Sequence, residues 1–190
     1  MMTIINNSYT HSAFVLFSHK FMKHIEEILL APLSNHVLII GFMTSGIIRS
    51  LINGTLVLIV AEYFTDLPII NPMICLFTAT ATATLFSLLG LLNGLWGKSF
   101  DDMATIPTFI LTPLIYLSGI FYPLSALPDT WQTIAHLNPI AHINIAFRYC
   151  FSPIADNTIW HTLVIITLFN IAAYYMVYRY SLNRDNLKVD

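Results

Sequence analysis

The sequence predicts an all-α protein, a polytopic bundle of transmembrane helices. Hydrophobic residues make up 56% of the 190 residues and charged residues only 9%, whereas about 25% of a typical soluble chain is charged. The charged residues leave long uninterrupted gaps, and a continuous apolar run crosses lipid only as a helix. These observations exclude a soluble enzyme, a disordered chain and a disulfide scaffold. The net charge of −2 argues against nucleic acid as a partner, because that binding usually needs a basic face.

Four charge-poor stretches are long enough to cross a bilayer, which takes about 20 helical residues. The predicted spans cover about 37–61, 69–96, 104–122 and 159–178. The chain is therefore expected to divide into an N-terminal cytoplasmic segment, a transmembrane domain and a cytoplasmic tail. These three parts are residues 1–36, 37–178 and 179–190.

Basic residues predict the orientation. They cluster before the first span, between the second and third, and after the fourth. These residues are Lys20, Lys23, Lys98, Arg179, Arg184 and Lys188. Only Arg148 falls between the third and fourth spans. The positive-inside rule then places both termini in the cytoplasm of a multi-pass inner-membrane protein.

The segment 20–31 has the pattern of an amphipathic helix. One face carries Phe21, Met22, Ile25, Ile28 and Leu29, and the other carries Lys20, Lys23, Glu26 and Glu27. Two interpretations are open. The helix either lies on the membrane surface or docks onto a partner protein on the cytoplasmic side.

Arg49 lies about 12 residues into the first span, roughly 18 Å along a helix. A charge at this depth in lipid is costly and marks a functional site by default. The sequence shows no evident carboxylate partner, since Glu62 lies almost four turns further along. Arg49 has either a structural role between helices or a direct role in a substrate path.

Gly90 and Gly94 form a GxxxG spacing in the second span. Small residues at this spacing let two helices approach closely. We favour ordinary helix packing over dimerisation as the interpretation.

The segment 123–152 is predicted to be external and is punctuated by Pro123, Pro128 and Pro139. Two short helices are expected, one over 129–137 and one from Pro139 to about Arg148. Re-entrant helices are tolerated in a membrane only when they are buried in protein or line a cavity. The segment is therefore a candidate exit gate, with simple capping of the helix ends as the alternative.

No sequence motif indicates catalysis. Gly97-Lys98-Ser99 lacks the glycine spacing of a phosphate-binding loop, and His136 and His142 have no further ligand at metal-binding spacing. We therefore expect no cofactor and no catalytic residue, and we interpret Cys75 and Cys150 as buried thiols.

The stretch Ser118-Gly-Ile-Phe-Tyr-Pro123, followed by Leu127-Pro128 and Leu137-Asn-Pro139, resembles the C-terminal signature of type-2 ABC transporter permeases. The resemblance covers about residues 8–180. Members of that family usually have six spans, and Met1–Tyr9 resembles the tail of their second helix. The resemblance therefore predicts an N-terminally truncated permease.

The resemblance implies a permease subunit of an exporter that moves a substrate out across the bacterial inner membrane. It implies a homodimer in the lipid bilayer, paired with two copies of a separate ATP-binding subunit that hydrolyses ATP. The alternative is a truncated, non-transporting membrane protein or an assembly partner of such a transporter.

The resemblance also assigns residue roles. The coupling helix that contacts the ATP-binding subunit would comprise Lys20, Lys23, Ile25, Glu26, Glu27, Ile28 and Leu29. The external gate would be shaped by Gly119, Phe121, Pro123, Pro128, Asn138 and Pro139.

Overall fold

The computed structural model describes residues 1–30, 33–65, 69–120, 137–151 and 158–181. Within these ranges the chain is helical and contains no strand, which confirms the prediction of an all-α bundle. The helical elements are α1 (Met2–Phe21), α2 (His24–Leu30), α3 (Asn35–Thr65), α4 (Pro72–Trp96), α5 (Phe100–Ile106), η1 (Pro107–Leu111), α6 (Thr112–Leu117), α8 (Pro139–Tyr149) and α9 (Thr158–Ser181).

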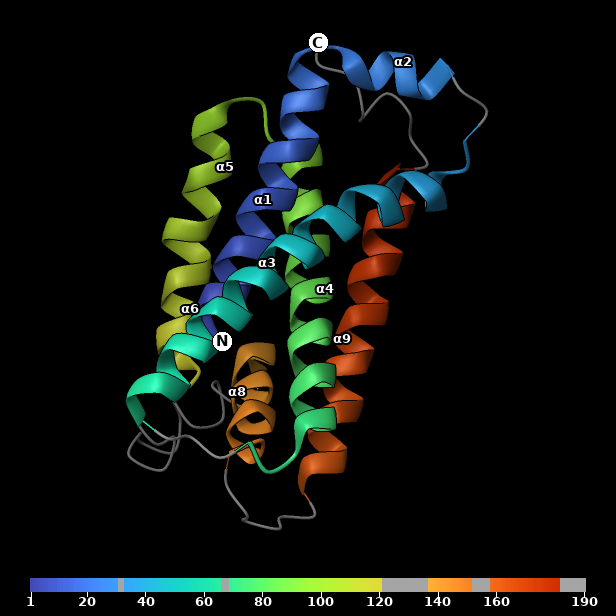
Figure 1. Ribbon diagram of the computed structural model, residues 1–190. Helices are drawn as coiled ribbons and strands as arrows, with labels where there is room; N and C mark the ends of the chain where they lie inside the picture. The colour runs from blue at the N-terminus through green and yellow to red at the C-terminus, as the bar shows by residue number, and fades with distance from the viewer. Residues whose placement is uncertain (31–32, 66–68, 121–136, 152–157, 182–190) are drawn as a thin grey trace.

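The helices form an elongated bundle, which α3 crosses obliquely (Figure 1). At one end, α2 lies across the bundle near the last turns of α1 and α4 (Figure 1). At the other end lie α8, the last turn of α3 and the first turn of α4 (Figure 1). We call these the α2 end and the α8 end.

Three helices are each long and apolar enough to cross a membrane, namely α3, α4 and α9. They coincide with three of the four predicted spans, 37–61, 69–96 and 159–178. The remaining predicted span, 104–122, falls on α5, η1 and α6, which together cover 100–117. The wide π-helical turn of η1 begins at Pro107, and Pro113 follows in α6. Each proline removes a backbone donor, which explains why this helix departs from regular α geometry.

The N-terminal segment differs from the expectation of a cytoplasmic segment over 1–36, because α1 is part of the bundle. It packs along α4 and α3 and buries Ile5, Tyr9 and Phe17. Its hydropathy is low because short polar residues interrupt the apolar ones. Several of these bond to their own helix, as when the Ser8 hydroxyl donates to the Ile4 carbonyl at 2.7 Å. Because of these polar residues, the hydropathy of residues 2–21 does not indicate a helix that packs within the bundle.

The first residue of the chain and the last residue of α9 lie far apart in the bundle. Met1 lines a cavity together with Cys75 and Arg148 near the α8 end. Ser181, the last residue of α9, lies at the α2 end, where its carbonyl accepts a hydrogen bond from the Asn35 side chain at 3.1 Å. Because α1 runs most of the length of the bundle, the first residue and the end of α9 lie at opposite ends.

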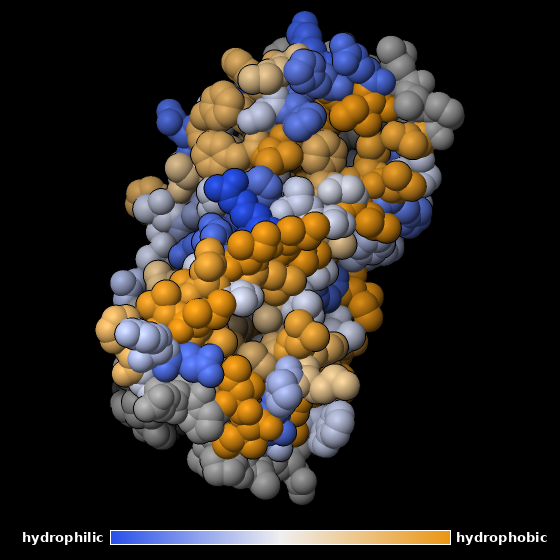
Figure 2. Space-filling view, viewed as in Figure 1, coloured by the Kyte–Doolittle hydropathy of each residue, from blue (hydrophilic) through white to orange (hydrophobic). Residues whose placement is uncertain are grey.

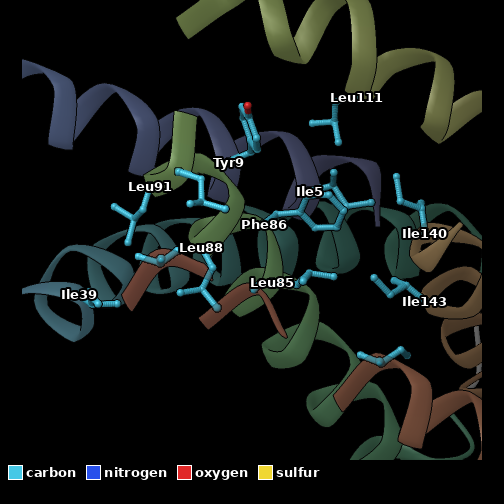
Figure 3. Packing of buried hydrophobic residues seen from close by; sticks show 14 of the residues in the cluster. Ile5, Tyr9, Ile39, Leu85, Phe86, Leu88, Leu91, Leu111, Ile140 and Ile143 are labelled. Carbon is cyan, nitrogen blue, oxygen red and sulfur yellow. The ribbon is translucent and has the colours of Figure 1, made fainter. Parts of the chain in front are cut away.

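The core is centred on α4, whose buried Leu85, Phe86, Leu88 and Leu91 meet residues of α1, α3, η1 and α8 (Figure 3). Glycine makes the closest of these contacts possible. A methyl group at Gly90 would overlap the carbonyl oxygen of Tyr9 in α1. The GxxxG spacing therefore packs α4 against α1 of the same chain, as the sequence analysis favoured.

The loop from α4 to α5 forms a helix cap. The hydroxyl of Ser99 accepts from the Asp102 amide at 3.2 Å, and the Asp102 carboxylate accepts from the amides of Lys98 and Ser99. These backbone hydrogen bonds lower the pKa of Asp102, since they stabilise the ionised carboxylate. Gly97-Lys98-Ser99 thus leads into a capping box.

Candidate functional site

A cavity of about 1040 Å³ opens near the α8 end, between α1, α3, α4 and α8. We call it the α8-end cavity. Most of its lining side chains are apolar, including Ile4, Leu58, Leu76 and Phe147. Two charged residues, Glu62 and Arg148, also line it. A hollow of this size and composition suits an apolar or amphiphilic molecule.

Arg148 connects α8 to the turn that follows α6. Its guanidinium donates to the carbonyl of Gly119 at 3.0 Å and to that of Ile120 at 3.5 Å. Gly119 has a φ of 75°, a conformation that glycine adopts without the steric penalty of a side chain. The predicted gate residue Gly119 therefore lies at a sharp turn beside the cavity.

Asn138 caps the N-terminus of α8 and connects it to α6. Its side-chain oxygen accepts from the Ile140 amide at 3.0 Å, and its amide group donates to the Leu114 carbonyl of α6 at 2.7 Å. Pro139 follows in the first turn, where its missing donor costs nothing. The predicted helix from Pro139 to about Arg148 is confirmed as α8.

The structure brings three of the predicted gate residues, Gly119, Asn138 and Pro139, to the contact between α6 and α8. Phe121, Pro123 and Pro128 lie outside the described residues. The same holds for the short helix expected over most of 129–137. α8 buries Ile140, Ile143 and Ala146 against its neighbours, which is the condition that a re-entrant helix must meet.

The predicted coupling segment becomes a sharp turn and the short helix α2. Lys23 has a φ of 59°, and this left-handed residue redirects the chain so that α2 lies across the end of the bundle (Figure 1). Ile25 is 2% exposed and anchors α2. Lys23 and Glu27 are exposed, and Ile28 is half-buried. The side chains of Glu26 and Leu29 lie outside the described part of the structure.

Lys20 lies apart from the other residues of this predicted set. It is only 7% exposed, and its ammonium group donates to the carbonyl of Leu95 at 3.0 Å. Leu95 belongs to the last turn of α4, where backbone carbonyls lack helical partners. Lys20 therefore joins the ends of α1 and α4.

Arg49 lies midway along α3 at a groove of about 370 Å³ that we call the polar groove. Its lining residues are Asn6, Asn7, Thr10, His11, Phe14 and Arg49. The Arg49 guanidinium donates to Nδ1 of His11 at 3.4 Å, and the Asn53 amide donates to the Asn7 side chain at 3.0 Å. Figure 2 shows hydrophilic side chains in the middle of a largely apolar face.

Sequence reasoning singled out Arg49 but missed Asn7 and His11. A signal for them exists, because Asn7 follows Thr3 by four residues, and Thr10 and His11 follow Asn7 by three and four. This spacing places them on one face of a helix. The pattern becomes visible only once residues 2–21 are recognised as a helix.

Comparison with known proteins gives a consistent result. Residues 1–152 match the family model described as ABC-2 type transporter. The chain is 42% identical to the inner membrane transport permease YadH of Escherichia coli (strain K12) over 177 residues, which cover 93% of this chain and 69% of the relative.

Two further relatives match at lower identity. The probable multidrug ABC transporter permease YbhR of Escherichia coli (strain K12) is 28% identical, with 82% of this chain and 44% of the relative covered. Nodulation protein J of Sinorhizobium fredii (strain NBRC 101917 / NGR234) is 29% identical, with 62% of this chain and 45% of the relative covered. No solved structure matches the chain.

Proposed function

The chain belongs to the ABC-2 type transporter family, and from this premise we propose that it is the permease subunit of an exporter. It is a multi-pass inner-membrane protein and a membrane subunit of an ABC transporter, a class of transporter that has an ATP-binding partner. The proposal adds that ATP is hydrolysed on a separate subunit and that the substrate moves outward. It also adds that two permease chains pair with two ATP-binding subunits.

The observation that carries this proposal is the position of α2. This helix lies across the α2 end, is anchored by buried Ile25 and presents exposed Lys23 and Glu27. A short helix held in this way offers a rigid projecting surface to a partner at the cytoplasmic side. We propose that α2 is the coupling helix and contacts the ATP-binding subunit through Lys23, Glu27 and Ile28, together with Glu26 and Leu29.

Movement of α2 has a direct physical connection to the bundle. Three residues separate Lys20 from the start of α2, and Lys20 is hydrogen-bonded to the end of α4. α4 packs closely on α1 at Gly90 and begins at the α8 end. There the amides of Ile70 and Asn71, just before α4, donate to the Cys150 carbonyl that follows α8. A tilt of α1 and α4 would therefore displace α8.

The proposed external gate comprises Gly119, Phe121, Pro123, Pro128, Asn138 and Pro139. Asn138 holds α8 against α6, and Arg148 holds it against the turn after α6, through hydrogen bonds to backbone carbonyls. Contacts of this kind can be exchanged for water at modest cost. When α8 moves, the α8-end cavity would open outward.

The experiment is purification of the tagged full chain from bacterial membranes in mild detergent, followed by assay of co-purifying ATPase activity. We expect a stoichiometric ATP-binding protein. Glu27→Lys should reduce its yield or its ATPase activity at least fivefold, about 1 kcal/mol, because the charge on the exposed face of α2 is reversed. Glu62→Lys, at the opposite end of the same bundle, is the matched control and should leave the yield of the ATP-binding protein unchanged.

Two results would contradict the proposal. One is a stably inserted wild-type chain that brings down no ATP-binding protein, which would favour a non-transporting role. The other is an equal effect of Glu27→Lys and Glu62→Lys, which would remove the coupling role of α2.

A further inference from the structure

The two helices that form the polar groove supply no counter-charge for Arg49. Residues 2–21 contain no aspartate or glutamate, and the only acidic residue of α3 is Glu62. Glu62 lies 13 positions beyond Arg49, roughly 20 Å along the helix. None of the described residues that line the groove is acidic. A guanidinium stays charged at any physiological pH.

The groove is built to hold an anion. Besides Arg49 it presents Asn6, Asn7, Thr10 and His11, all with side-chain groups able to donate hydrogen bonds. Asn53 donates to the Asn7 side-chain oxygen, and the Asn7 amide group donates to the Thr3 carbonyl at 2.9 Å, which leaves one amide hydrogen of Asn7 for a ligand. An arginine fork surrounded by neutral donors matches the geometry of a phosphate or carboxylate.

The surroundings of the groove add an apolar component. Ile48, Ile52 and Leu56 on α3 are each more than half exposed. Ile48 directly precedes Arg49, and Ile52 and Leu56 follow it at helical spacing. Apolar side chains lie next to hydrophilic ones on this face of the molecule (Figure 2). A molecule whose anionic group reaches Arg49 would rest its hydrocarbon on these apolar side chains.

We propose that the polar groove binds the anionic headgroup of an amphiphile, with a phosphate or carboxylate on Arg49 and His11 and hydrocarbon along α3. This binding belongs to the membrane chain itself and needs no ATP-binding partner. It can therefore succeed or fail independently of the transport function.

The test measures equilibrium binding to the purified full chain in neutral detergent. The probes are radiolabelled dioctanoyl phosphatidic acid, dioctanoyl phosphatidylcholine and inorganic phosphate. We expect phosphatidic acid to bind at least tenfold more tightly than either of the others. Arg49→Gln should weaken its binding about tenfold or more, as expected for loss of a charge-assisted contact. Arg49→Lys, which keeps the charge but loses the fork, should weaken binding less than Arg49→Gln does.

The matched control is Arg179→Gln, the same change in the last turn of α9, which should leave binding unchanged. If Arg49→Gln does not fold, Thr10→Phe fills the groove while Arg49 is kept, and it should also abolish binding. Equal binding of phosphatidic acid and phosphatidylcholine would overturn the proposal. So would inorganic phosphate binding as tightly as phosphatidic acid, or Arg49→Gln behaving like Arg179→Gln.

Discussion

The ammonium group of Lys20 lies where the ends of α1 and α4 meet. Its hydrogen bond to the Leu95 carbonyl satisfies an acceptor in the last turn of α4. Its positive charge also interacts favourably with the negative C-terminal end of the helix dipole. On sequence alone Lys20 belongs to the polar face of an amphipathic segment, next to Lys23. The structure separates the two residues, since Lys20 points inward and Lys23 is exposed.

This difference predicts unequal effects of one substitution. Lys20→Met should destabilise the protein by about 1–3 kcal/mol, because a buried carbonyl loses a charged donor. Lys23→Met, the matched change at an exposed position, should stay within about 0.5 kcal/mol of wild type. Thermal unfolding in detergent, followed by circular dichroism, measures both. Equal effects would mean that the Leu95 contact contributes nothing to stability.

At the scale of elements, the tightest contact is the one between α1 and α4. Gly90 lets the backbone of α4 approach the Tyr9 carbonyl. Gly94 lies one turn further, where a Cβ would come within 3.0 Å of the Ala13 carbonyl. Small residues at the crossing of two helices gain dispersion contacts between backbones. The pair α1 and α4 therefore behaves as one unit that extends from the α2 end toward α8.

Gly90→Ala should lower the stability of this unit by about 1–3 kcal/mol, the usual cost of overpacking. The control is Gly41→Ala in α3, where a Cβ would meet nothing within 4 Å. That change should be neutral or stabilising by up to about 1 kcal/mol, because alanine is the better helix former. Thermal unfolding of both variants in the same detergent measures the two changes in stability. A stable Gly90→Ala variant would show that α1 can shift away from α4.

At the scale of the whole molecule, charge separates along the bundle. Lys20, Lys23, Lys98 and Arg179 gather at the α2 end, while Arg148 lies at the α8 end. The positive-inside rule, applied to this arrangement, puts the α2 end in the cytoplasm and the α8 end outside. We propose this orientation from the positions of the basic residues at the helix ends.

Cysteine labelling tests this orientation. In a chain with Cys75→Ala and Cys150→Ala, one cysteine is introduced at Leu137 or at Met22, which are 75% and 62% exposed. A membrane-impermeant maleimide should label Leu137→Cys in intact spheroplasts and Met22→Cys only after permeabilisation. The reverse pattern would invert the orientation and, with it, the assignment of α2 to the cytoplasm.

Composition and local patterns alone predict the membrane class, three long apolar helices, the helix that begins at Pro139 and the basic end of the bundle. These features depend on composition and on local chemistry, namely apolar run length, proline and asparagine at a helix start, and the distribution of lysine and arginine. Each pattern can be recognised within a short stretch of sequence, such as the 25 residues of α4. The family resemblance also rests on a local stretch, residues 117–139.

Only the tertiary structure decided where the polar residues of α1 point. The contacts of His11 with Arg49 and of Lys20 with Leu95 join residues 38 and 75 positions apart. Hydropathy counts Asn7, Ser8 and His11 as evidence against a buried helix. In the folded chain Ser8 bonds to its own turn, and Asn7 and His11 meet groups on α3. A polar group can leave water when a hydrogen-bond partner replaces the water. For Asn7 and His11 that partner lies on another helix, which local sequence patterns do not reveal.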